Sequence, residues 1–99
     1  MKMKKPVHPG IVFRDAYMQP LNISVKDAAQ ILGISVKHLS NIVNAKVGIT
    51  ADMAARISMM TKTSAKLWLG MQNSYDLSQL DMDKYQDIKC DTHIPEIRT

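Results

Sequence analysis

The stretch at 35–46, SVKHLSNIVNAK, carries the side chains of this chain that are best suited to chemistry. In a helix, Lys37 and Asn41 lie four residues apart on one polar face, and Val36 lies near its start. A lysine can donate to the acceptors of guanine, an asparagine can make two hydrogen bonds to adenine, and a valine can touch a thymine methyl. This pattern predicts readout of base edges in double-stranded DNA.

A helix that enters the major groove with its first turns divides the polar residues into two groups. The residues expected nearest the bases are Ser35, Val36, Lys37, His38 and Asn41. A second group would contact phosphates, which position a protein without specifying sequence. Its expected members are Ser24, Lys26, Ser40, Asn44 and Lys46.

Residues 24–46 supply the elements that would hold these side chains, two short helices joined by a tight turn. The apolar residues of the first helix recur at i, i+3, i+4 and i+7, namely Val25, Ala28, Ala29 and Leu32. Gly33 suits the left-handed residue that ends a helix, and Ser35 suits the N-cap of the next one.

The second helix has its own buried face and a hydrophobic staple. Its core residues are Leu39, Ile42 and Val43, and Ile34 before the cap is placed to pack against Leu39. These signals together predict a helix-turn-helix. The alternative is an ordinary helical hairpin in an all-α domain, whose outer face would carry the same polar residues in contact with solvent.

Three further helices complete the predicted all-α fold of five helices. The first spans Pro9 to Gln19, with Pro20 as its stop and an apolar stripe of Val12, Phe13, Ala16 and Tyr17. The fourth is capped by Thr50, with Asp52 in its first turn and a core side of Met53, Ala54, Ile57 and Met60. The fifth runs over 64–80. Residues 1–80 are thus expected to form one helix-turn-helix domain.

The fifth helix is apolar on two sides. One stripe consists of Leu67, Trp68, Met71 and Tyr75, and a second consists of Leu69, Leu77 and Leu80. A helix on the surface of a small monomer needs only one stripe, so the second predicts the interface of a homodimer. Cover by the N-terminal arm or by the C-terminal tail is the alternative.

Charge separates the body of the chain from its end. Residues 1–80 hold ten Lys or Arg against four Asp, whereas residues 81–99 hold three against five acidic residues. A basic body attracts the phosphate backbone of DNA. Residues 81–99 lose helical periodicity and are expected to form an extended or disordered acidic tail.

The sequence gives little support for an enzyme, a cofactor or a metal site. His8, His38 and His93 lie far apart without a partner at catalytic spacing, and no glycine-rich phosphate loop occurs. Cys90 and His93 are too few ligands for structural zinc. One cysteine forms no internal disulfide, which favours a cytoplasmic protein, and no apolar run predicts a membrane span or signal peptide.

Three longer segments resemble the HigA/VapI-type antitoxins of the Xre-like helix-turn-helix class. They are VHPGIVFRDAYMQPLNIS at 7–24, NAKVGITADMAARIS at 44–58 and TSAKLWLGMQNSYDL at 63–77. The resemblance implies a lambda-repressor-like, usually dimeric domain. It also implies an antitoxin that neutralises a HigB-type mRNA-cleaving toxin and represses its own operon. A free-standing Xre-like regulator and a protein-interaction module are the alternatives.

The chain departs from this family pattern in three places. Ala45 stands where the family often has glycine, so the recognition helix is expected to end differently. Val36 and Asn41 replace arginines, so the operator sequence does not carry over by analogy. Lys66 replaces an acidic residue that would complete a capping box after Thr63, and a lysine in a first turn opposes the helix dipole.

Overall fold

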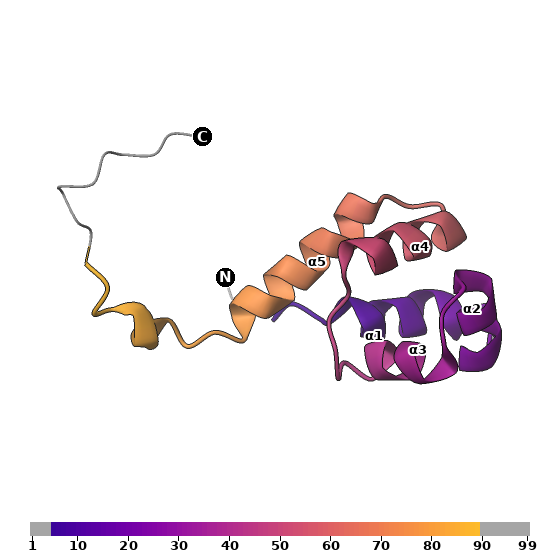
Figure 1. The fold of residues 1–99 in the computed structure, drawn as a ribbon, viewed down its shortest axis with the longest axis horizontal. Coiled ribbons are helices and arrows are strands. Elements are labelled where there is room, and N and C mark those ends of the chain that lie inside the picture. The colour runs from indigo at the N-terminus through magenta and orange to yellow at the C-terminus, as the bar shows by residue number, and fades with distance from the viewer. Residues whose placement is uncertain (1–4, 90–99) are drawn as a thin grey trace.

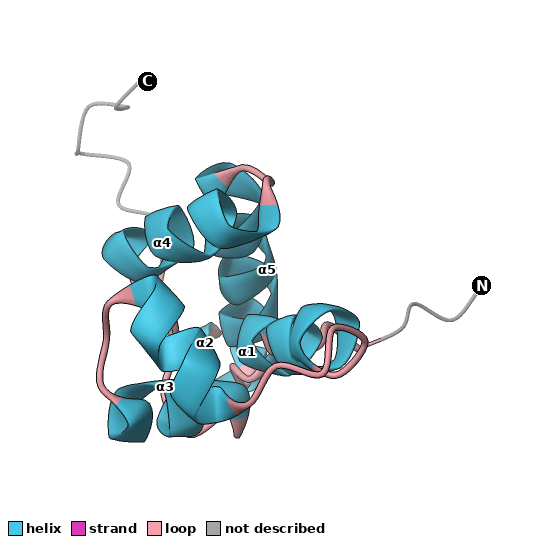
Figure 2. Ribbon diagram, turned by 90° about the vertical axis from the view of Figure 1, so that its right-hand side faces the viewer, coloured by secondary structure: helices cyan, strands magenta, loops and turns pink. Residues whose placement is uncertain are grey.

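The computed structural model describes residues 5–89, and in this part of the chain every regular element is helical. Figure 1 shows α5 running away from the group formed by the other helices, and Figure 2 shows α4 on one side of α2 and α3. The elements are α1 (Pro9–Phe13), a π-helix (Arg14–Met18), α2 (Val25–Leu32), α3 (Val36–Val43), α4 (Ala51–Thr61), α5 (Ala65–Ser78) and a 3-10 helix (Met82–Tyr85). The predicted fold of five helices is confirmed.

The predicted signals of the helix-turn-helix form as expected. The hydroxyls of Ser24 and Ser35 cap α2 and α3, accepting hydrogen bonds of 3.0 Å from the backbone N–H of Asp27 and His38. Gly33 ends α2 in the left-handed region with φ 73°. Its backbone N–H donates to the Gln30 carbonyl, and the next N–H donates to the Ala29 carbonyl, which closes the helix as a Schellman motif.

The first predicted helix differs from expectation in its second half. From Arg14 to Met18 the chain is π-helical, and the N–H of Gln19 reaches the Arg14 carbonyl five residues back. Because a π turn contains more residues than an α turn, the buried side shifts along the sequence. Met18 is therefore buried and Ala16 is exposed, so the predicted core position of Ala16 was wrong.

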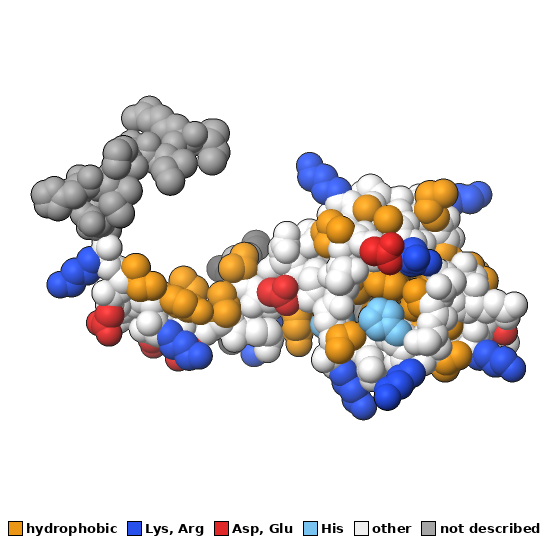
Figure 3. Space-filling model, viewed as in Figure 1, with side chains coloured by type: hydrophobic (Ala, Val, Ile, Leu, Met, Phe, Trp, Pro, Cys, Tyr) orange, Lys and Arg blue, Asp and Glu red, His pale blue; other side chains and the backbone are white. Residues whose placement is uncertain are grey.

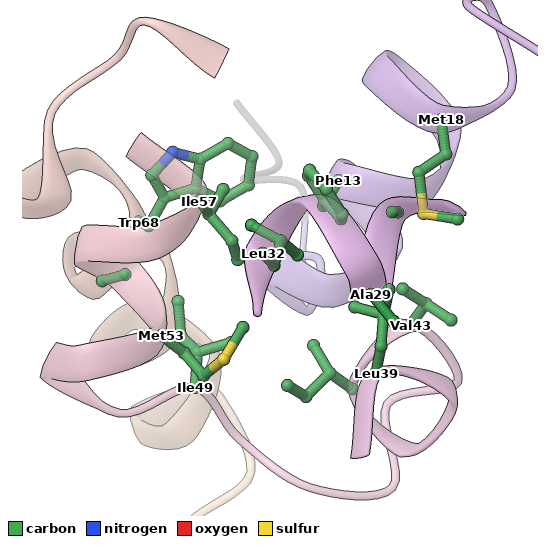
Figure 4. Packing of buried hydrophobic residues seen from close by; sticks show 13 residues of the cluster. Phe13, Met18, Ala29, Leu32, Leu39, Val43, Ile49, Met53, Ile57 and Trp68 are labelled. Carbon is green, nitrogen blue, oxygen red and sulfur yellow. The ribbon is translucent and has the colours of Figure 1, made fainter. Parts of the chain in front are cut away.

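All five helices contribute to one hydrophobic core. Figure 4 shows side chains from α1, α2, α3, α4 and α5 meeting in the space between the helices. Trp68 of α5 is fully buried, and its ring lies 6.1 Å from that of Phe13 in an edge-to-face arrangement. The predicted core residues of α2, α3 and α4 all lie in this cluster or pack against it. The core thus fixes α3 against α1 and α2.

The start of α5 corrects the capping prediction. Ser64, not Thr63, is the N-cap, and its hydroxyl accepts from the Leu67 N–H at 3.1 Å. Thr63 instead accepts a 2.6 Å hydrogen bond from the indole N–H of Trp68. A capping box from Ser64 would need an acidic residue at position 67, so Lys66 does not replace a box partner. Lys66 still lies in the first turn of α5, where a positive charge opposes the helix dipole.

The two apolar stripes of α5 are divided differently from the prediction. Leu69 packs partly against the core, whereas Leu67, which was expected in the core stripe, is half exposed. Trp68 and Met71 face the core as predicted. Of the three residues expected at a dimer interface, Leu77 is mostly exposed, Leu80 is about half exposed and Leu69 is partly buried. The unpartnered face of α5 therefore lies toward its C-terminal end.

The chain beyond α5 contains a short helix where extended chain was predicted. Met82–Tyr85 forms a 3-10 turn, and the carboxylate of Asp81 accepts from the Asp83 N–H at 3.1 Å. The proposed ligands Cys90 and His93 lie outside the described residues, as does the end of the predicted tail. None of the helices within 5–89 has the length and hydropathy needed to cross a bilayer.

Candidate nucleic-acid interface

The start of α3 presents its predicted base-reading residues to solvent. Ser35, Val36, Lys37 and His38 are all exposed, with Val36 at 49% of its full surface. Asn41, one turn further on, is half-buried. Because Leu39, Ile42 and Val43 are buried on the other side, the exposed residues share the outer face of α3. These side chains could therefore enter a groove without any part of the core being moved.

The predicted phosphate contacts lie at helix ends around this face. Ser24 begins α2, Lys26 is exposed in its first turn, and Lys46 is exposed just after α3. Asn44 turns back along α3, because its amide nitrogen donates to the Ser40 carbonyl at 2.8 Å. Ser40 is half-buried under this contact. Of these groups, the exposed side chains of Lys26 and Lys46 are therefore the best placed to reach a phosphate.

The surface around α3 is basic. Figure 3 shows Lys and Arg side chains along the lower rim of the globular part, in the region where Figure 1 draws α3. The ion pairs within residues 5–89 join Arg14 to Asp15 and Arg56 to Asp52. Lys26, Lys37 and Lys46 therefore have no acidic partner within hydrogen-bonding range in that part of the chain. Unpaired cations of this kind favour binding to a polyanion.

Close contact between α1 and α3 fixes how near the two helices lie to each other, and so fixes the position of α3, the predicted recognition helix. A Cβ atom on Gly10 would overlap the backbone carbonyl of Ile42, so only glycine allows α1 to cross α3 at this distance. The guanidinium of Arg14 adds a second tie, donating to the Val43 carbonyl near the end of α3 at 3.3 Å. Sequence reasoning assigned neither role, because both depend on residues about thirty positions apart.

Arg56 of α4 holds the turn of the helix-turn-helix. Its guanidinium donates to the Leu32 carbonyl at 2.9 Å, and its Nε pairs with Asp52 at 2.8 Å. A cation at the C-terminal end of α2 satisfies a free carbonyl and favours the helix dipole. The sequence analysis missed Arg56. Arg56 lies four residues after Asp52 on a predicted helix, and this spacing could have indicated the ion pair between them.

The loop after α3 is tied to α5 by the buried side chain of Gln72. The Gln72 amide oxygen accepts from the Ile49 N–H at 2.8 Å, and its nitrogen donates to Asp76 at 2.8 Å. His8 packs beside this loop, edge-to-face with the ring of Tyr75 at 5.0 Å. Its Nδ1 accepts from the Gly10 N–H at 2.9 Å and caps α1. His8 therefore begins the first helix and is not part of a catalytic group.

Burial gives His8 an altered titration. Its side chain is almost fully enclosed, and desolvation lowers the pKa of His8 from its usual value of 6.5. The backbone of Val47 and the negative charge of Asp76 act in the opposite direction. The imidazole therefore belongs to the scaffold between α1, α5 and the loop after α3, and its burial favours the neutral form.

The recognition helix ends as if a glycine were present. Ala45 has φ 59°, its N–H donates to the Ile42 carbonyl, and the Lys46 N–H donates to the Asn41 carbonyl at 2.9 Å. This is the same Schellman closure that Gly33 makes after α2. The prediction that α3 would end differently was wrong. The alanine instead adopts a left-handed conformation that costs about 1–2 kcal/mol.

Within residues 5–89 we find no group of three or more His, Cys, Asp or Glu side chains arranged to hold a metal ion. The exposed polar groups of α3 are instead hydrogen-bond donors and acceptors on a rigid helix. Such an arrangement recognises a surface by shape and hydrogen bonding.

Comparison with known proteins relates this geometry to characterised chains. The family model described as Helix-turn-helix matches residues 16–68. Virulence-associated protein A of Dichelobacter nodosus is 37% identical over 92 residues, covering 89% of this chain and 90% of that protein. These matches span the turn, the recognition helix and most of the core.

Two solved structures share the whole arrangement of helices. Pseudomonas aeruginosa antitoxin HigA with the higBA promoter is 31% identical with a TM-score of 0.78, covering 90% of this chain and 99% of that one. The antitoxin GraA in complex with its operator is 25% identical with a TM-score of 0.77, covering 100% and 98%. Both relatives are described with the DNA that they bind.

Proposed function

The chain belongs to the helix-turn-helix family and is related to HigA antitoxins and virulence-associated proteins, and from this premise we propose that it represses its own operon as an antitoxin. The family is a DNA-binding, antitoxin-like one without enzymatic activity. The observation that carries the proposal is the exposed start of α3. Ser35 caps this helix, its apolar side packs into the core, and the side chains of its outer face are exposed to solvent.

In the proposed complex the first turns of α3 enter the major groove of operator DNA. Lys37 and Asn41 read base edges, and Val36 contacts a thymine methyl. Ser35 and His38 flank these positions at the same end of the helix. Phosphate contacts come from Ser24, Lys26, Ser40, Asn44 and Lys46. The hydrogen bonds that tie Arg56 and Gln72 to neighbouring backbone support this arrangement, because they keep the reading helix rigid.

The proposed partners are double-stranded operator DNA, a second copy of the chain and a HigB-type toxin that cleaves mRNA, all in the cytoplasm. The support for the toxin is the relation to HigA antitoxins. One proposed docking site for a basic toxin is the acidic segment from residue 81 onward. Removal of residues 82–99 tests this site when toxin affinity and oligomeric state are measured on the same shortened protein. Unchanged toxin affinity would contradict it, and a loss of affinity would support it only if the shortened protein keeps the oligomeric state of the full chain.

Binding of the purified protein to the DNA upstream of its own gene tests the repressor function. The comparison DNA is a scrambled duplex of the same length, measured near physiological salt because non-specific affinity depends steeply on ionic strength. We expect a strong preference for the upstream DNA. Equal binding to both duplexes would contradict sequence-specific repression and favour a protein-interaction module.

A second measurement separates an antitoxin from a free-standing regulator. The upstream DNA is titrated with the protein, and a purified HigB-type toxin, taken from an adjoining gene where one is present, is then added. An antitoxin is expected to form a stable complex with that product and to suppress its cleavage of mRNA. Operator binding without any such complex would support the regulator instead.

A further inference from the structure

The last residues of α5 and the segment that follows them carry uncovered apolar side chains. We call residues 77–88 the apolar arm. Figure 3 shows a row of hydrophobic side chains along this segment, which leaves the globular part in Figure 1. The exposed fractions run from 41% to 73% over its large apolar residues, which are Leu77, Leu80, Met82, Tyr85 and Ile88. So many uncovered apolar groups in twelve residues mark a surface that binds another surface.

A groove on the same protomer offers apolar walls of matching character. It has a volume of about 460 Å³ and lies between the N-terminal segment, α1 and the first half of α5. Val7 and Leu67 stand at its edge and are each about half exposed. The residues that form its apolar walls are Pro6, Val7, Val12, Leu67 and Met71.

The arm and the groove carry opposite charges. The apolar arm contains Asp81, Asp83 and Asp87 against the single cation Lys84, which gives it a net charge of −2. Lys66 lines the groove, and Lys5 directly precedes its first wall residue. Lys66 has no ion-pair partner within residues 5–89, and the dipole of α5 opposes its charge. A carboxylate from outside the protomer would offset that cost.

We propose that the apolar arm of one protomer docks in this groove of a second copy, with its aspartates facing Lys66. The inference deepens the proposed homodimer and does not depend on DNA binding. In a twofold pair with antiparallel α5 helices, the arm after one α5 meets the first turn of the other. Lys66 and Leu67 of the second copy lie in that turn. The exchange is reciprocal, so it closes at two copies.

The proposed contact removes many apolar groups from water. Two arms contribute ten large apolar side chains that are exposed in the single protomer, and each arm would cover the apolar walls of one groove. Gly70 adds room at the contact. It lies in the groove on the exposed side of α5, and a Cβ there would meet no atom of its own protomer within 4 Å. A partner segment can use this space.

Sedimentation equilibrium of the full-length protein without DNA tests the ionic part of the contact. We expect Lys66→Glu and Asp83→Lys each to raise the dimer Kd at least tenfold, and the double variant to recover most of the loss. Lys66→Glu favours the dipole of α5, so thermal unfolding should show an intact fold. The matched control is Lys62→Glu, which makes the same charge change at an exposed position outside the groove and should leave the dimer Kd unchanged.

The apolar part of the contact is tested by Met82→Ser against Met59→Ser. Both methionines are mostly exposed, at 64% and 83%, but only Met82 belongs to the apolar arm. We expect Met82→Ser alone to weaken the dimer. Gly70→Ala sharpens the result, because it should weaken the dimer while strengthening the helix of each protomer.

Two results would overturn the proposal in distinguishable ways. A wild-type dimer whose Kd ignores the charge exchange and Met82→Ser would show that the two copies meet through another face. A wild-type protein that stays monomeric, with arm variants that lose only toxin binding, would assign the apolar arm to the toxin and would also contradict the proposed homodimer. Operator preference, measured separately, decides the repressor function in either case.

Discussion

The helix-turn-helix and the apolar arm present opposite surfaces at two ends of the molecule. At α3 the apolar residues other than Val36 are buried, the outer face is mostly polar and the nearby lysines have no ion-pair partner within residues 5–89. Along the arm the apolar residues face outward and the charges are mostly acidic. The first surface is built to exchange hydrogen bonds with a hydrated, charged partner, and the second to remove apolar area from water.

The two regions also differ in how they are held. Three ties from other elements fix the helix-turn-helix, namely the contact at Gly10, the Arg14 hydrogen bond and the Arg56 hydrogen bonds. The hydrogen bonds found in the apolar arm join residues at most four positions apart. Recognition of a fixed groove requires a preformed surface, whereas an arm that docks on a partner becomes fixed only in the complex.

The largest effect is expected where the rigid region is most tightly packed. Gly10→Ala forces a Cβ into the Ile42 carbonyl and should lower the free energy of unfolding by about 3 kcal/mol or more. Operator binding should fall with it, because α3 loses its support. The control is Gly70→Ala, measured at concentrations at which the protein is monomeric, where its Cβ meets open space and should stabilise the protomer by about 0.5–1 kcal/mol. Equal melting curves for the two variants would refute the close crossing of α1 and α3.

The next effect separates base contacts from phosphate contacts within the same surface. Lys37→Ala should weaken operator binding by about 1–3 kcal/mol and relax sequence preference at one position of each half-site. Lys46→Ala should weaken binding to every sequence alike and reduce the salt dependence. Titrations on operator and scrambled DNA over a range of salt concentrations measure both. Identical behaviour of the two variants would show that the division is wrong.

A smaller effect compares the two ends of the helix-turn-helix. Ala45→Gly removes the strain of a left-handed alanine and should raise the free energy of unfolding by about 0.5–1 kcal/mol. Gly33→Ala should do the reverse, because it introduces the same strain after α2 and brings a Cβ to 3.0 Å from Arg56. Chemical denaturation measures both changes. A loss of stability in Ala45→Gly would contradict the closure assigned to α3.

The smallest effect is a pH dependence from His8, because two opposing influences offset part of its desolvation. Its folded pKa lies below 6.5, so the unfolded chain binds a proton first as the pH falls. The contribution of His8 to stability is complete above about pH 7 and declines below pH 6.5 until the folded pKa is reached. Denaturation at a series of pH values should show this decline.

Two asparagine variants test whether the pH dependence of stability comes from His8. His8→Asn keeps an acceptor for the Gly10 N–H without a titrating group, so it should flatten the stability curve in this window. His38→Asn makes the same substitution at an exposed position and is the matched control for the change of residue type. An unchanged slope in His8→Asn would exclude His8 as its source.

The sequence predicted the features that depend on neighbouring residues. Ser24, Ser35 and Gly33 act within one turn of their own positions, so local pattern sufficed for both helix ends of the motif. The predicted apolar faces of α2, α3 and α4 were also correct, since one periodicity runs through each helix. The candidate base-reading residues followed from the same periodicity, and their roles stay predictions.

The features that escaped prediction depend on distant partners or on a break in periodicity. The π-helix moved the buried side from Ala16 to Met18, which no α-helical count can foresee. Thr63 was expected to cap α5, but the indole of Trp68 occupies its hydroxyl. Leu67 and Leu69 exchanged roles because the position of α4 decides which side of α5 is covered. The spacing of residues within one helix cannot predict these contacts, because they are made with other helices.

The position of Gln72 links α5 to the spacing of the two half-sites in the operator. Its side chain grips the loop directly after α3, while the same helix continues into the apolar arm. In the proposed dimer, the separation of the two reading helices is then set by the length of α5 rather than by a flexible linker. α5 would act as a ruler for the spacing of half-sites, which for paired major grooves falls at multiples of about 10 base pairs. An insertion in α5 would change the spacing that is recognised and leave the bases read by each α3 the same.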